Sequence, residues 1–174
     1  MQSILKTIII LILFTGINGE TRPLIQRYFH KEDMGYDYKR GTYLIVLGNS
    51  DENLEVELRE KETGDFVHFK QTQGYDVDVV TLDSLGITDE MALKNYIEYY
   101  YNNHPLLEYV LLVGDINGPY ATIPTFTIPS YNESEDDVTD YPYTYIDDNA
   151  KLEPEFFIGR WAIRSVEDMI KIKS

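Results

Sequence analysis

Short apolar runs separated by longer amphipathic stretches form the main pattern of this chain from residue 42 onward. Three runs, at residues 42–47, 76–82 and 108–115, have the length and apolar character of buried strands. Residues 156–162 form a fourth run of the same kind. The pattern therefore predicts four strands.

The stretches between these runs predict helices. In residues 51–73, Leu54, Leu58, Phe66 and Phe69 form a helical stripe, although residues 54–58 also alternate as a strand would. We favour a helix, with Gly64 as a candidate break and Gly74 as the residue that ends it.

A second helix is predicted after residue 88. Its apolar positions recur at the i, i+3, i+4, i+7 and i+8 spacing of a buried helix face, and Thr88 is the expected N-cap. These positions are Leu93, Tyr96, Ile97, Tyr100 and Tyr101. A third helix is expected from the capping box of Ser165 and Asp168.

This order of strands and helices predicts an α/β fold, in which a mainly parallel sheet lies between two helical layers as a three-layer sandwich. Functional groups of such folds gather at the carboxyl ends of the strands, where Asn49, Asp83 and Asp115 are expected. Residues 116–144 show no regular period and predict a long loop that is functional or mobile.

The first 19 residues have the features of a secretory signal peptide: Lys6, an apolar run at residues 7–14, and small residues up to Gly19. The run is too short to cross a bilayer, which takes about 20 residues. Residues 20–41 are a polar and aromatic lead-in. We therefore expect a secreted or extracytoplasmic protein without a membrane attachment after cleavage. A retained membrane or lipid anchor is the alternative.

Charge and cysteine content narrow the function. The net charge is −15 and becomes −16 when Lys6 is removed, which argues against binding to nucleic acid or anionic lipid. The negative charge is compatible with Ca²⁺ binding, and equally with an acidic surface that keeps the protein soluble. The chain has no cysteine, and therefore neither a disulfide nor a thiol nucleophile.

Three stretches, in this order, resemble the gingipain-type cysteine peptidases: residues 73–80, residues 109–115 with Ile123-Pro124, and Asp147-Asp148 leading to residues 154–160. The resemblance implies a caspase-like fold, of which residues 42–174 would be an incomplete first subdomain. The family's cysteine and histidine follow later strands and have no counterpart here. The resemblance thus implies protein or peptide substrates, a missing C-terminal catalytic portion, and no activity of this fragment.

The resemblance also implies a structural calcium ion, with Asp115 and Glu155 as ligands and Asp148, or alternatively Asp147, between them. Calcium takes six to eight oxygen ligands, which mixed carboxylates and carbonyls supply. An ordinary solvated acidic loop is the alternative. We expect Asp140 to be solvated in the same way, and Arg160, in an apolar strand, to pair with a buried carboxylate.

Two functions remain in view. The first is the N-terminal part of a secreted gingipain-like cysteine endopeptidase, expected to be cut short within the last helix. The alternative is a secreted non-catalytic module that binds protein through residues 116–144, with or without a stabilising calcium ion. A nucleotide-binding enzyme is the weakest reading, because no glycine-rich phosphate loop follows any strand. The histidines, His30, His68 and His104, are expected to be surface or capping residues.

Overall fold

The computed structural model describes residues 40–50, 53–131, 136–146 and 153–173. The chain divides into two units, Met1–Asp37 and Tyr38–Ser174, and all described residues belong to the second. The predicted signal peptide and nearly all of the lead-in lie outside the described residues. No helix in the described part is long and apolar enough to span a membrane.

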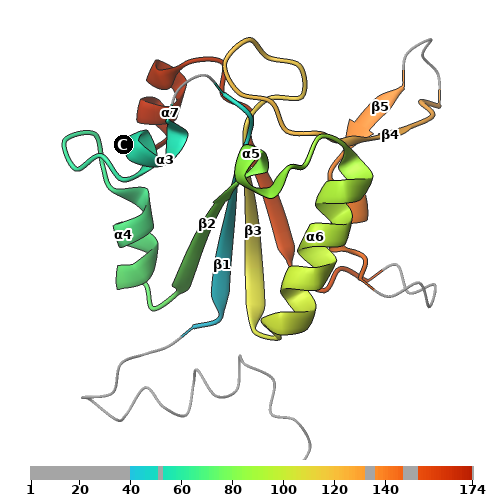
Figure 1. The fold of residues 1–174 in the computed structure, drawn as a ribbon, viewed down its shortest axis with the longest axis horizontal. Coiled ribbons are helices and arrows are strands. Elements are labelled where there is room, and N and C mark those ends of the chain that lie inside the picture. The colour runs from blue at the N-terminus through green and yellow to red at the C-terminus, as the bar shows by residue number, and fades with distance from the viewer. Residues whose placement is uncertain (1–39, 51–52, 132–135, 147–152, 174) are drawn as a thin grey trace, which may run out of the picture. The chain divides into compact units, whose positions relative to one another are not determined.

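A four-stranded parallel sheet forms the centre of the second unit (Figure 1). Its strands are β1 (Thr42–Leu47), β2 (Asp76–Thr81), β3 (Leu107–Val113) and β6 (Phe157–Trp161), in the order β2-β1-β3-β6. Every neighbouring pair is parallel. The predicted fold class, α/β with a mainly parallel sheet, is confirmed.

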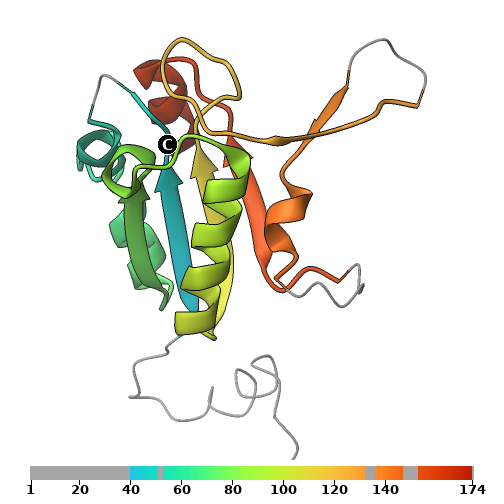
Figure 2. The ribbon, with the colours of Figure 1, turned by 45° about the vertical axis from the view of Figure 1, so that its right-hand side comes forward.

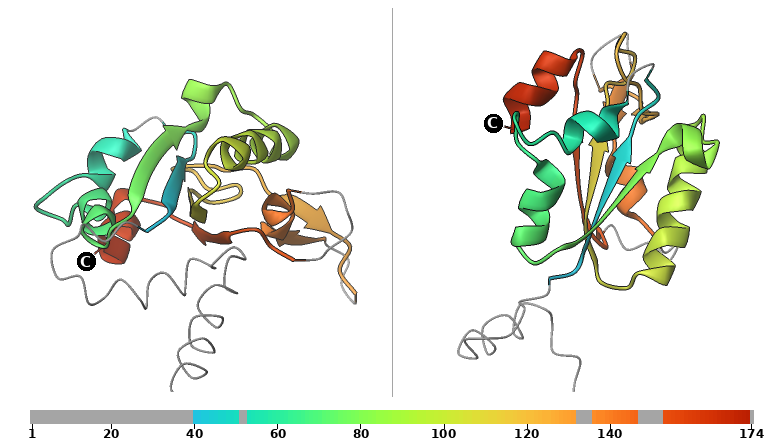
Figure 3. Two further views of the ribbon diagram at one scale, coloured as in Figure 1. Left: turned by 90° about the horizontal axis from the view of Figure 1, so that it is seen from below. Right: turned by 60° about the vertical axis from the view of Figure 1, so that its left-hand side comes forward.

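Helices cover both faces of the sheet (Figure 3). One face carries α3 (Leu54–Leu58), α4 (Phe66–Thr72) and α7 (Val166–Lys173). The other carries α5 (Leu82–Leu85), α6 (Glu90–Asn103) and the 3₁₀ helix η2 (Tyr141–Thr144). The β1–β2 and β2–β3 connections cross the sheet in opposite directions, so crossovers of one hand place their helices on opposite faces.

The core has two halves, one on each side of the sheet. Alternate residues of β1 supply both: Tyr43, Ile45 and Leu47 face one layer, and Leu44 and Val46 face the other. All five are at most 8% exposed. A strand that is buried on both faces explains why residues 42–47 read as a continuous apolar run.

The predicted helix at residues 51–73 is two short helices. The loop between α3 and α4 contains Gly64 at φ +104°, a backbone conformation that other residues rarely adopt. The N-cap of α6 is Asp89, whose carboxylate accepts a hydrogen bond of 2.8 Å from the amide of Ala92. The prediction of Thr88 as this cap was wrong by one residue.

Residues 116–144 contain regular structure that the sequence pattern did not reveal. Strands β4 (Phe126–Ile128) and β5 (Asp137–Thr139) pair antiparallel in a hairpin that projects from the body of the unit (Figures 1 and 2). Three-residue strands are too short to show a period, which is why the segment read as irregular. The hairpin lies within the segment that the sequence predicts to be a functional or mobile loop.

Candidate functional site

The carboxyl ends of β1 and β3 border the point at which the sheet connections change direction. In open α/β sheets this switch point forms the crevice where ligands bind. Asn49 follows β1 and Asp115 follows β3, as the sequence predicted. Asp83 lies exposed in α5, and we assign it no part in this group.

In this protein the crevice is filled by the chain itself. Thr122 forms an antiparallel bridge with Asn49 and a parallel bridge with Asp115. The Asn49 amide donates to the Thr122 carbonyl at 3.0 Å, and the Thr122 amide donates to the Asn49 carbonyl at 3.1 Å. On the other side, the amides of Asp115 and Ile123 donate to the carbonyls of Ala121 and Asp115, both at 2.9 Å.

Close backbone packing holds this segment in place. A Cβ atom on Gly48 would lie 2.6 Å from the Thr122 carbonyl oxygen, a distance too short for any side chain. A Cβ atom on Gly114, whose φ is +156°, would lie 3.1 Å from a side-chain carbon of Ile123. The two glycines at the ends of β1 and β3 thus admit a third strand-like segment where other folds of this type bind a ligand.

Asp115 organises the loop that follows β3. It is 7% exposed, and its two oxygens accept hydrogen bonds from the Ile116 amide at 2.8 Å and the Arg164 Nε at 3.0 Å. These bonds, that of Ile116 first, lower the pKa of the Asp115 carboxyl below its ordinary value. A carboxylate held ionised by donors on both oxygens is a structural anion and a poor general base.

Arg160 ties the segments above the sheet together. Its Nε and Nη2 donate to the two carboxylate oxygens of Asp140 at 2.8 and 2.7 Å. Its remaining hydrogen bonds go to the carbonyls of Gly114, Ile123 and Pro124, at 3.1 to 3.2 Å. The expected pairing of Arg160 with a carboxylate is confirmed, although Asp140 is half-buried rather than fully buried. The expectation that Asp140 is only solvated was wrong, because its side chain is 18% exposed and paired.

The structure does not bring Asp115 and Glu155 together. Glu155 precedes β6, and the register pairs Phe157 with Tyr109 near the start of β3, whereas Asp115 lies beyond the end of β3. Glu155 also accepts a hydrogen bond of 3.1 Å from Tyr101, near the end of α6. The two carboxylates therefore lie at opposite ends of the sheet, and one calcium ion cannot be bound by both.

The other predicted calcium ligands, Asp147 and Asp148, lie outside the described residues. Within the described part of the chain, no three histidine or carboxylate side chains are placed to hold a metal ion. The described residues therefore do not fit the predicted calcium site as a single cluster.

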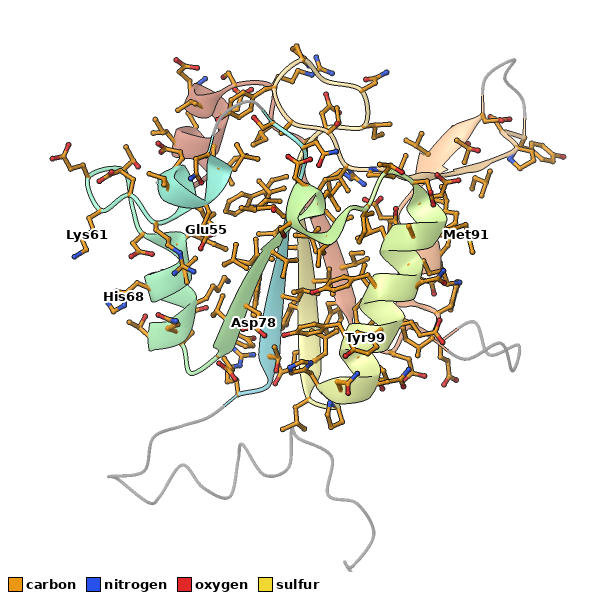
Figure 4. The ribbon with its side chains drawn as sticks, in the orientation of Figure 1. Glu55, Lys61, His68, Asp78, Met91 and Tyr99 are labelled. Carbon is orange, nitrogen blue, oxygen red and sulfur yellow. The ribbon has the colours of Figure 1, made fainter. Side chains whose placement is uncertain are left out.

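The described histidines occupy the positions expected of surface and capping residues. His68 lies exposed on α4 (Figure 4). His104 ends α6 and stacks on the ring of Tyr100 with 4.0 Å between the ring centroids. The hydroxyl of Tyr100 in turn donates to Asp78 on β2. His30 lies outside the described residues.

Comparison with known proteins identifies the family. The sequence model of peptidase family C25 matches residues 36–172. The chain belongs to peptidase family C25. This agrees with the gingipain-type resemblance of the three sequence stretches. No curated protein matches the chain.

Two solved gingipain structures share the fold of this C25 chain. One is the complex of the pro- and mature domains of RgpB from Porphyromonas gingivalis, with 25% identity and a TM-score of 0.56 over 75% of this chain. The other is the Arg-specific cysteine proteinase gingipain R (RgpB), with the same identity and TM-score over 77% of this chain. This chain spans 27% of the length of each.

Proposed function

We propose that this chain is the N-terminal part of a secreted gingipain-like cysteine endopeptidase, whose nucleophile and general base lie in sequence outside these 174 residues. One combination of findings carries the proposal: a C25 match over residues 36–172 in a chain without cysteine. Peptide-bond attack in this chemistry needs a thiolate activated by a neighbouring imidazole. These residues alone therefore hydrolyse no peptide bond.

In this proposal the described unit acts as a scaffold for the catalytic part. The filled crevice between β1 and β3 supports a scaffolding role, because it leaves the usual ligand position to the segment around Thr122. Substrates of the whole protein are proteins or peptides. Its predicted signal peptide directs it out of the cytoplasm.

The test is to isolate the native protein from its source culture with an antibody against residues 53–73, and to treat it with a biotinylated thiol-directed peptidyl inhibitor. We expect a labelled species well above the 20.3 kDa of this chain. The recombinant 174-residue chain is the matched control and should stay unlabelled. An unlabelled native species at or below 20.3 kDa would refute the peptidase assignment.

The projecting hairpin favours one alternative function, a secreted module that binds protein without catalysis. Ile128 and Val138 on its strands are 47% and 51% exposed, and Tyr131 beyond β4 is 95% exposed. Exposed apolar groups on a protruding element are common at protein interfaces. An unlabelled native species of the size of this chain would favour this alternative.

Calcium binding remains a proposal for the end of the sheet at which Glu155 lies. A site there would combine Glu155 with Asp147 or Asp148 and with backbone carbonyls. Calcium added to the chelator-treated chain should then raise its melting temperature. Glu155→Gln should abolish the rise, whereas Asp115→Asn, at the opposite end, should leave it intact. An equal response of both variants would contradict this placement.

A further inference from the structure

Among the residues that the structure describes, nothing covers most of one face of the strand β6. Side chains alternate along β6, so Phe157, Gly159 and Trp161 point to the face that carries α3, α4 and α7. The ring stacking of Phe157 on Tyr109, with 5.2 Å between centroids, confirms this side. Parallel strands are normally buried on both faces.

The exposure of these residues shows that the space above them is open. Phe157 is 67% exposed, although it is a large aromatic residue in a strand of the parallel sheet. Gly159 is exposed, and a Cβ atom built on it would meet nothing within 4 Å. Trp161 is half-buried beside Phe66, with 4.6 Å between their rings. We call Phe157, Gly159 and Trp161 the β6 strip.

The helices on this face of the sheet leave most of the β6 strip uncovered. Phe66, on α4, reaches the strip at Trp161 and covers only that end of it. The last described residue of α7, Lys173, has its ammonium bound to Thr63 at 2.9 Å and to the side chain and carbonyl of Glu57. These bonds anchor the end of α7 at the α3–α4 segment (Figure 1).

The strip is also chemically uniform. None of its three residues is charged, and the one charged residue of β6, Arg160, points to the opposite face, where it binds Asp140. The outer edge of β6 bonds to no other strand in the described part of the chain. The missing cover is therefore apolar, and it has to lie along a single five-residue strand.

We propose that the β6 strip is the docking site of a segment of the same peptidase, from sequence outside these 174 residues. An apolar side chain of that segment fills the space above Gly159. This inference rests on the proposed function. It is supported by the family relatives, of whose length this chain spans 27%. A second copy fits less well, because stable dimers bury about 800 Å² per partner, which exceeds what one face of a five-residue strand offers.

Hydroxyl-radical footprinting of the native, longer protein tests the inference without any substitution. The recombinant 174-residue chain is the reference. We expect oxidation of Phe157 to fall at least fivefold in the native protein, and oxidation of Trp161, the only tryptophan, to fall with it. Tyr99 and Met91, which are 66% and 51% exposed on α6, are the matched controls and should react equally in both (Figure 4).

Each outcome separates this inference from the proposed function. If the native protein is longer but its Phe157 is as reactive as in the fragment, the proposed docking site is refuted and the peptidase assignment stands. Protection in the isolated chain that grows with concentration identifies a second copy as the cover and also overturns the proposal. A native protein of the size of this chain refutes both the proposed function and this inference.

A pair of variants supplies an independent measurement. Phe157→Lys should change the melting temperature of the isolated chain by less than about 2 °C, because the exposed ring contributes little to its stability. In the longer protein the same change should lower the melting temperature by roughly 5 °C or more, since it places a charge in a buried contact. Met91→Lys is the control and should leave both unchanged. Equal behaviour of the two variants in the longer protein contradicts the inference.

Discussion

Replacing Arg160 by methionine should destabilise the described unit more than any surface substitution. The change keeps much of the side-chain volume but removes a bidentate ion pair and three hydrogen bonds to carbonyls. It leaves the carboxylate of Asp140, which is 18% exposed, without its counter-ion. Breaking a buried pair from one side costs about 3–5 kcal/mol. Because both side chains retain some solvent contact, we expect the lower end, about 3 kcal/mol.

Urea unfolding of the 174-residue chain, followed by the fluorescence of Trp161 and by circular dichroism, measures this loss. With a slope of about 2 kcal/mol per molar urea, a loss of about 3 kcal/mol lowers the midpoint by about 1.5 M. Arg59→Met is the matched control, because Arg59 pairs with Glu55 on the surface of α3. That variant should lose no more than about 0.5 kcal/mol.

A second substitution tests the reason for the loss. If the unpaired carboxylate is the main cost, Asp140→Asn should recover about 1 kcal/mol in the Arg160→Met background, although it destabilises the parent chain. Equal midpoints for Arg160→Met and Arg59→Met would refute the reasoning. They would mean that the hairpin base is held by Phe126 and Tyr143, which pack at 5.0 Å, and that the ion pair adds little.

Three further predictions concern the local features that position the site. Asp89→Ala should lower the free energy of unfolding by about 1 kcal/mol and Thr88→Ala by much less, in urea titrations that show which residue caps α6. Gly48→Ala should destabilise by about 3 kcal/mol or prevent folding, because its methyl group meets backbone at 2.6 Å, whereas Gly159→Ala should change stability by less than about 1 kcal/mol. The lowered pKa of Asp115 contributes stability above its ordinary value of 3.8 that is lost as pH falls below it, so the parent should lose more stability than Asp115→Asn between pH 5 and pH 2.

The strands and long helices were predictable because burial alone fixes their pattern. Residues 42–47 are buried at every position, and the spacing from Leu93 to Tyr100 follows the buried face of α6. The cap of α6 was missed by one residue because Thr88 and Asp89 are both good caps, and only the backbone geometry decides between them. Local pattern thus predicts the buried strands and the long helix, but neither the short elements nor the residue at which an element begins.

The site was harder to predict because its contacts join residues far apart in sequence. The need of Arg160 for a carboxylate partner followed from its place in an apolar strand, but nothing local singled out Asp140, twenty residues earlier, among the acidic residues of its loop. The separation of Asp115 from Glu155 depends on the parallel register of β3 and β6, which sequence spacing does not show. A ligand set taken over from a resemblance therefore has to be checked against the register of the strands that carry it.

The described part of the chain combines a filled switch point with a strand face that is open to solvent. Gly48 and Gly114 let the segment around Thr122 close the switch point, and the Arg160–Asp140 pair fixes the base of the hairpin beside it. The end of the sheet that usually binds ligands is thus occupied by the chain itself. Among the described residues, the apolar surface of the sheet that is open to solvent lies instead along β6, where Phe157 is exposed. In the described part of the chain the crevice is filled and one face of β6 is open. Both features support our proposal that the unit carries a neighbouring part of a longer peptidase, and the footprinting of Phe157 tests that proposal.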